Sequence, residues 1–153
     1  MLPLSHSFWR RLGFFRHGYT DAPDKAIKTF EKFFEKANEF SSLKSQFVSL
    51  ELGPGDSVLT AFAARARGAK AAWLVDSGDF ALRDLESIKV FCQGFSDRRD
   101  QSLGQSSAVD FHRFLRDNGV YYLTNGLNSL HQISKNSIDF CWSQVVLEHI
   151  LKD

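Results

Sequence analysis

The chain has 153 residues, which is enough for one domain with a sizeable core. Its 19 basic and 18 acidic residues leave a net charge of +1, so no broad positive field is available to attract nucleic acid. Cys92 and Cys141 form no C-x-x-C pair, which argues against a disulfide framework or a zinc site and favours reduced thiols, in or near the core, of a cytoplasmic protein. No run approaches about 18 apolar residues and no continuous apolar stretch follows the basic N-terminus, so we expect neither a membrane span nor secretion.

The first 45 residues are expected to form an aromatic-rich helical extension or cap, followed by the main domain at residues 46–153. Residues 1–19 mix aromatic side chains with three arginines. Such a segment can lie on a membrane surface or bind an anionic substrate, although a flap packed over the domain is the commoner arrangement. A capping acid and a proline then begin a helix, on which Phe30 and Phe34 share an apolar face. That face must be hidden against the sheet or over a ligand pocket.

The main domain contains two apolar runs that are expected to form neighbouring strands, and each run ends at or near a carboxylate. Residues 47–52 run into Gly53 and Gly55, as a buried parallel strand does when its backbone turns sharply beneath a ligand. Residues 71–76 form the second run, and its terminal Asp76 lies 23 residues after Gly53. A carboxylate at the tip of the second strand, about 20 residues beyond the glycines, can accept hydrogen bonds from both ribose hydroxyls. The alternative to this nucleoside site is an ordinary turn between strand and helix.

The remaining elements alternate along the chain. Helices are expected at residues 57–67, from about 80 to 92, at 109–117 and at 144–151, with strands at 120–123 and 137–143. Polar residues 94–107 predict an exposed, mobile loop, in which Arg98 and Arg99 either bind an anionic substrate or form a solvated charge run. Strands separated by such helices imply parallel pairing, so the fold class is α/β with a Rossmann-like, doubly wound, mostly parallel sheet. Ligands bind these sheets beyond the carboxyl ends of the strands, where the strand order reverses.

The glycine turn itself narrows the ligand. A dinucleotide site would place a third glycine three residues after Gly55, where the chain has Val58, and the Gly-Lys-Ser/Thr of a phosphate-binding loop is absent. The turn therefore suits a nucleoside that has no pyrophosphate to cradle.

At this point three stretches together resemble the class I S-adenosylmethionine-dependent methyltransferases. Glu-Leu-Gly-Pro-Gly at residues 51–55 is similar to the first motif of that family, and Val-Asp-Ser at 75–77 to its second-strand acid. Asn-Ser-Ile-Asp at 136–139, continued by the string from Ser143 to Ile150, resembles the family's fourth strand and the helix after it. The likeness is closest to a bacterial branch associated with glycan and small-molecule pathways.

The resemblance implies S-adenosyl-L-methionine as the cofactor and assigns roles by position. The turn at residues 53–55 would lie against the methionine and ribose, with Glu51 near the methionine amino group, Asp76 on the ribose hydroxyls and Ser77 near the adenine. Many members of the family place an acid at the other adenine edge, where this chain has none. The implied cofactor-binding residues are Glu51, Gly53, Pro54, Gly55, Asp56, Asp76, Ser77, Asn125, Gly126, Leu127, Ser143 and Gln144.

The expected chemistry is methyl transfer to a small-molecule or glycan acceptor, for which His149 is the candidate base, although a histidine in that helix is more often structural. The family's sheet has seven strands, and this chain stops after the fourth, so we expect an incomplete domain, with a homo-oligomer or a completing chain as partner. Three rivals stay open: an inactive S-adenosylmethionine-binding protein, a NAD-dependent oxidoreductase and a purely structural interaction module.

Overall fold

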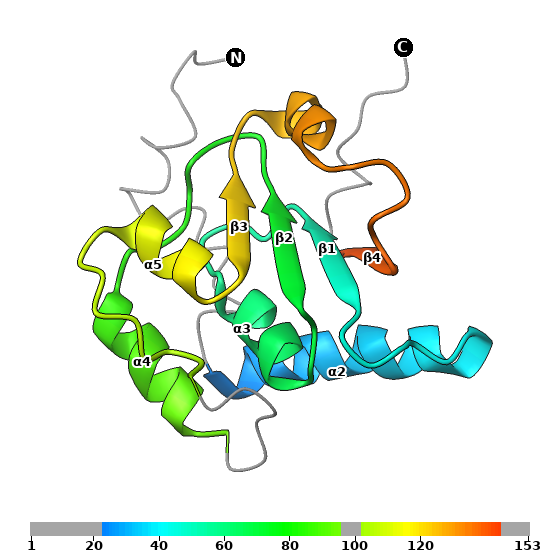
Figure 1. Cartoon of the computed structure of the whole chain (residues 1–153), viewed down its shortest axis with the longest axis horizontal. Helices are drawn as coiled ribbons and strands as arrows, with labels where there is room; N and C mark the ends of the chain where they lie inside the picture. The colour runs from blue at the N-terminus through cyan, green and yellow to red at the C-terminus, as the bar shows by residue number, and fades with distance from the viewer. Residues whose placement is uncertain (1–22, 96–101, 145–153) are drawn as a thin grey trace, which may run out of the picture.

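The computed structural model of the chain describes residues 23–95 and 102–144 (Figure 1). Several expectations from the sequence fall outside these ranges. They concern the aromatic and basic residues 1–19, the charged pair Arg98 and Arg99, the helix expected at 144–151, and the candidate base His149 within it.

Within the described residues, four parallel strands form one sheet in the order β3-β2-β1-β4. Their bounds are Val48–Leu52 for β1, Ala71–Val75 for β2, Val120–Leu123 for β3 and Phe140–Ser143 for β4. The order steps outward from β1 to β3 and then returns to the other side of β1, so it reverses between β1 and β4 (Figure 1). This arrangement confirms the α/β, Rossmann-like fold that the sequence predicts.

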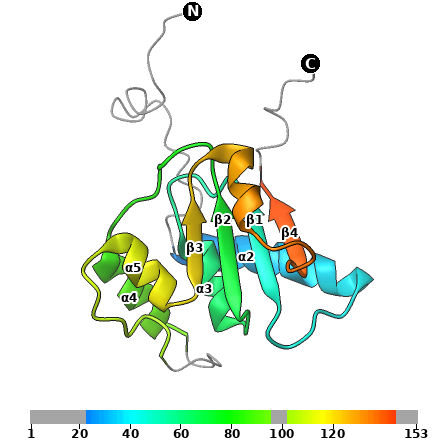
Figure 2. The same ribbon diagram turned by 45° about the horizontal axis from the view of Figure 1, so that its top comes forward.

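The helices are α2 (Pro23–Phe40), α3 (Leu59–Ala66), α4 (Leu85–Gln93) and α5 (Phe111–Asp117), with the 3-10 helix η1 (Gly126–Gln132) between β3 and β4. α2 and α3 lie together on one face of the sheet (Figure 2). α3 is buried at seven of its eight positions, because it packs on the sheet and also contacts α2 and α4. An alanine-rich sequence suits this place, since small side chains let the neighbouring elements approach closely.

The aromatic face of α2 packs against the rest of the core. The ring of Phe30 lies 6.3 Å from that of Phe140 on β4, and the ring of Phe34 lies 5.3 Å from that of Phe47 just before β1. Phe33 stacks on Trp142 with 4.8 Å between the ring centroids. Phe30 and Phe34 therefore pack against the sheet side of the core, whereas Phe33 also lines a groove.

The structure corrects the sequence expectations at several places. Between β3 and β4, where the sequence predicts no helix, the structure contains η1. β4 begins at Phe140 rather than residue 137, and α4 begins at Leu85 rather than near residue 80. The loop expected to be exposed at residues 94–107 is partly buried: Leu103 is only 1% exposed, because it packs into the core. Cys92 is buried as expected, whereas Cys141 is exposed, because it alternates on β4 with the buried Phe140 and Trp142 and so faces the other side of the sheet.

None of the helices within the described ranges is long and apolar enough to cross a membrane.

Candidate functional site

The glycine turn after β1 has the backbone that the sequence predicts. Gly53 and Gly55 adopt φ angles of 74° and 71°, in the left-handed region that side chains rarely tolerate. The turn is fixed to the neighbouring strand, because the Gly53 N–H donates to the Val75 carbonyl at 2.8 Å. Pro54 and Asp56 are buried within the same turn. The two glycines are therefore required by the path of the backbone.

Asp76 holds this turn through its side chain. Its Oδ2 accepts a hydrogen bond from the Gly55 N–H at 2.9 Å, and its Oδ1 accepts one from the Ser77 N–H at 2.7 Å. The sequence places the turn and the acid 21 residues apart, and the structure joins them by a direct contact. A carboxylate has about four acceptor sites, so both oxygens keep capacity for further donors.

The third strand brings its own loop to the same place. The Asp76 N–H donates to the Leu123 carbonyl at 2.9 Å, and the Gly126 N–H donates to the Asp76 carbonyl at 2.8 Å. Gly126 has a φ of 54°, and Leu127 beside it is 68% exposed. Asn125 is exposed at the start of the same loop.

Glu51 lies below the turn, on the side that faces α3. Its carboxyl is buried, and its Oε2 accepts a hydrogen bond from the Thr60 hydroxyl at 2.5 Å. Burial raises the pKa of Glu51 to about 8, and the negative charge of Asp76 acts in the same direction, while the bond from Thr60 opposes it. Glu51 is therefore mostly protonated at neutral pH.

Ser143 and Gln144 lie at the end of β4, on the far side of β1 from Asp76. Ser143 is opposite Leu52 in the parallel register, and its Oγ is buried without a hydrogen-bond partner among the described residues. Both Ser143 and Leu52 line a groove of about 410 Å³. The other lining residues are mainly aromatic or apolar and come from α2 and β4: Phe33, Lys36, Ala37, Phe40, Phe140, Cys141 and Trp142.

The structure thus separates the sequence-predicted residues into groups. The turn, Asp76 with Ser77, and the start of η1 form one hydrogen-bonded cluster at the carboxyl ends of the strands. Glu51 is adjacent to this cluster but faces the helix layer, and Ser143 with Gln144 lies across β1.

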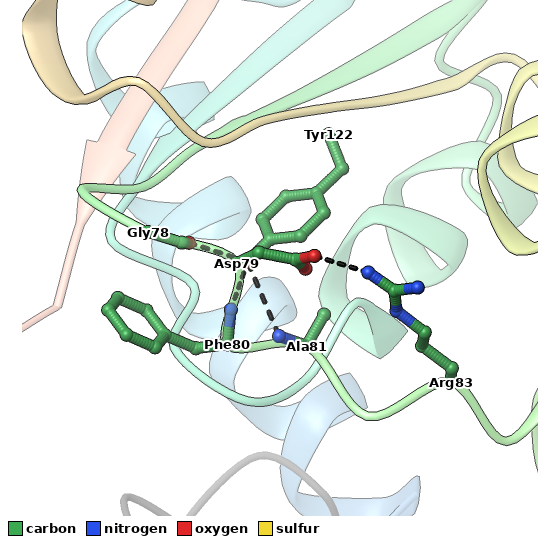
Figure 3. A network of polar contacts seen from close by, with 6 residues as sticks. All are labelled: Gly78, Asp79, Phe80, Ala81, Arg83 and Tyr122. Atoms are coloured by element: carbon green, nitrogen blue, oxygen red, sulfur yellow. Dashed lines mark hydrogen bonds and ion pairs between the residues drawn. The ribbon is translucent and has the colours of Figure 1, made fainter. Parts of the chain in front are cut away.

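One residue of this region, Tyr122 on β3, is not among those that the sequence predicts. Its hydroxyl contacts the segment that follows Ser77, through hydrogen bonds with residues 78, 80 and 81 (Figure 3). The available signal was its place on a strand whose alternate residues are buried, because a buried tyrosine hydroxyl usually finds a polar partner. The identity of that partner is not contained in the strand itself.

Over the described ranges, no three His, Cys, Asp or Glu residues gather in a way that could hold a metal ion. Comparisons with protein-family models, with curated proteins and with solved structures find no match to this chain.

Proposed function

We propose that this chain binds S-adenosyl-L-methionine at the carboxyl ends of β1 and β2 and belongs to a methyltransferase. The observation that carries the proposal is the contact between the Asp76 carboxylate and the Gly55 N–H. This contact joins the turn, whose two glycines have positive φ angles, to a carboxylate that can accept further hydrogen bonds. Both lie next to the point between β1 and β4 where the strand order reverses, which is where ligands bind such sheets.

The residues present fit such a ligand. Asp76 would accept hydrogen bonds from the ribose hydroxyls, the turn at residues 53–55 would lie against the ribose and methionine, and exposed Leu127 would cover one face of the adenine. Ser143, with its buried hydroxyl, would border the methyl-donor end. Bound S-adenosylmethionine supplies an activated methyl group on a sulfonium.

The work left to the protein is to bind, orient and exclude water. Methyl transfer needs the acceptor atom in line with the methyl carbon and close to it, in a site from which water is excluded. The apolar groove next to Ser143 is a suitable place for an acceptor, because Leu52 and Ser143 reach it from the two strands that flank the crevice. We infer a small-molecule or glycan acceptor, as the sequence resemblance implies.

The test is calorimetric titration of the purified full chain with S-adenosylhomocysteine, and separately with NAD. We expect saturable binding of S-adenosylhomocysteine and none of NAD. Asp76→Asn keeps an oxygen for the Gly55 N–H but loses the charge and half of the acceptor sites, so it should weaken binding by at least about tenfold.

Glu86→Gln is the matched control, because Glu86 is an exposed acid on α4 whose ion pair with Lys89 is at the surface. Glu86→Gln should bind S-adenosylhomocysteine with the affinity of the unmodified chain. Absence of binding to the folded chain would refute the proposal, and NAD binding in its place would favour an oxidoreductase. Binding of S-adenosylhomocysteine without methyl transfer to any acceptor tried would support the cofactor site. It would also favour an inactive S-adenosylmethionine-binding protein over an active methyltransferase.

A further inference from the structure

The segment between Asp76 and α4 leaves the proposed nucleoside site at Ser77, which the sequence resemblance puts near the adenine. It continues without regular structure to Asp84, the N-cap of α4. A segment of this kind has no regular backbone hydrogen bonds within a helix or a sheet to fix its position. Its hydrogen bonds to other parts of the chain therefore determine where Ser77 lies.

Tyr122 supplies three of those bonds through a single oxygen. Its hydroxyl accepts from the Phe80 N–H at 3.0 Å and from the Ala81 N–H at 3.3 Å, and it donates to the Gly78 carbonyl at 3.1 Å. Figure 3 shows the ring pointing from β3 into the bend of this segment, with Gly78, Phe80 and Ala81 around it. The hydroxyl thus replaces the backbone pairing that the segment lacks.

A second contact fixes the same segment from the opposite side. The Leu82 N–H donates to the Asp56 carbonyl in the glycine turn at 2.8 Å. The segment is therefore held between β3 and the turn. A displacement of residues 78–82 would therefore also displace the two groups on which the proposed function rests, Asp76 and the glycine turn.

The hydroxyl is not needed to fill space. Tyr122 is 7% exposed, and its ring lies parallel to that of His112 at 6.4 Å, contacts that a phenylalanine ring would also make. Burial raises the pKa of Tyr122 to about 12, so its hydroxyl stays protonated and can donate to Gly78. The nearby ion pair of Asp79 with Arg83 is exposed and adds little to the hold on the segment.

We propose that Tyr122 is a positioning residue for the nucleoside site, whose hydroxyl fixes residues 77–82 so that Asp76 and Ser77 stay where a nucleoside can bind. This inference rests on the proposed function. It goes further by assigning a role to a residue that touches the loop and not the ligand.

Tyr122→Phe and Tyr121→Phe form a matched pair on one strand. Tyr121 points to the other face of the sheet, where its ring stacks on Trp73 at 4.3 Å. Both variants lose one hydroxyl, but only Tyr122→Phe removes the three bonds to the segment. We expect Tyr122→Phe to bind S-adenosylhomocysteine about tenfold more weakly, and Tyr121→Phe to bind it as the unmodified chain does.

Hydrogen–deuterium exchange separates positioning from general stability. In Tyr122→Phe the amides of Phe80 and Ala81 should exchange at least about tenfold faster, while those of α2 and β1 keep the rates of the unmodified chain. In the unmodified chain, S-adenosylhomocysteine should slow exchange at residues 77–82. This last measurement needs no variant, so it holds even where Tyr122→Phe fails to fold.

The two proposals fail in different ways. If the unmodified chain binds S-adenosylhomocysteine, and folded Tyr122→Phe binds it equally well or residues 77–82 do not respond to it, the role of Tyr122 is refuted and the cofactor site stands. If the unmodified chain does not bind S-adenosylhomocysteine, the proposed function is refuted, and the role of Tyr122 is refuted with it.

Discussion

Glu51 stands at the carboxyl end of the central strand with a buried carboxyl group that receives a hydrogen bond from Thr60. Its pKa is raised to about 8 because burial penalises the charged form. In the unfolded chain this group titrates near 4.5. Between these two values the native state binds a proton that the unfolded state does not, so the free energy of unfolding falls as the pH rises.

Replacing Glu51 by glutamine should remove this pH dependence. The amide cannot ionise, and its oxygen can still accept from Thr60. Urea unfolding at pH 6, 7 and 8 should show the unmodified chain losing up to about 1.4 kcal/mol per pH unit more than Glu51→Gln. At pH 8 the variant should be the more stable of the two.

Glu86→Gln, which changes an exposed acid, should keep the slope of the unmodified chain. Equal slopes for Glu51→Gln and the unmodified chain would mean that the carboxyl of Glu51 is already ionised in the native state.

The sequence predicts those site residues whose role follows from the local backbone conformation or from a position at the end of a strand. Gly53 and Gly55 follow from a strand that must turn with positive φ, and Asp76 follows from its place at the end of the next strand. The partners of Tyr122 and Glu51 could not be predicted in this way. Tyr122 bonds to residues more than 40 positions away, and the Thr60 hydroxyl reaches Glu51 only because α3 packs on that face of β1.

Among the elements, α2 depends most on tertiary packing. Phe30 is 0% exposed and contacts Phe140 on β4, whereas Phe40, at the end of the same helix, is 82% exposed. Both residues lose the same atoms on replacement by alanine, and the gain in helix propensity is below about 1 kcal/mol at either site. The large difference between them is the burial of the two rings.

We therefore expect Phe30→Ala to lower the free energy of unfolding by about 3–5 kcal/mol and Phe40→Ala to change it by less than about 0.5 kcal/mol. Denaturant unfolding of the two variants measures both values. Similar values for the two would show that α2 does not pack on the sheet through Phe30.

The elements that the sequence predicts least well have clear physical reasons. η1 is a 3-10 helix made of residues that also favour turns, so its pattern resembles that of a loop. β4 starts late because Asp139, just before it, pairs with the first residue of β1: the Val48 N–H donates to the Asp139 carboxylate at 2.9 Å, and the Asp139 N–H donates to the Val48 carbonyl at 3.0 Å. Leu103 is buried although its neighbours are polar, because the Gly104 N–H is held by the Asn118 side chain at 2.5 Å.

At the level of the whole molecule, the parallel sheet collects loops that are far apart in sequence. The order β3-β2-β1-β4 brings the turn after β1, the segment after β2 and the start of η1 together at the carboxyl ends of the strands. The sheet face that α2 covers packs into the hydrophobic core. The sequence predicts parallel strands whose following loops meet at one end, because right-handed crossovers allow few alternatives, whereas the strand order itself comes from the structure. The groove beside β4 does not follow from the pattern, since it depends on how α2 lies against the last strand.

An NMR titration of the ¹⁵N-labelled full chain with S-adenosylhomocysteine decides whether the ligand binds at that end of the sheet. We predict that the largest shifts fall on the amides of Gly53, Gly55, Asp56 and residues 76–78 and 125–127. The amides of α5 and of the first turns of α2 should stay unchanged. Shifts confined to the groove between α2 and β4, or no shifts at all from a folded chain, would contradict an S-adenosylmethionine site at the glycine turn.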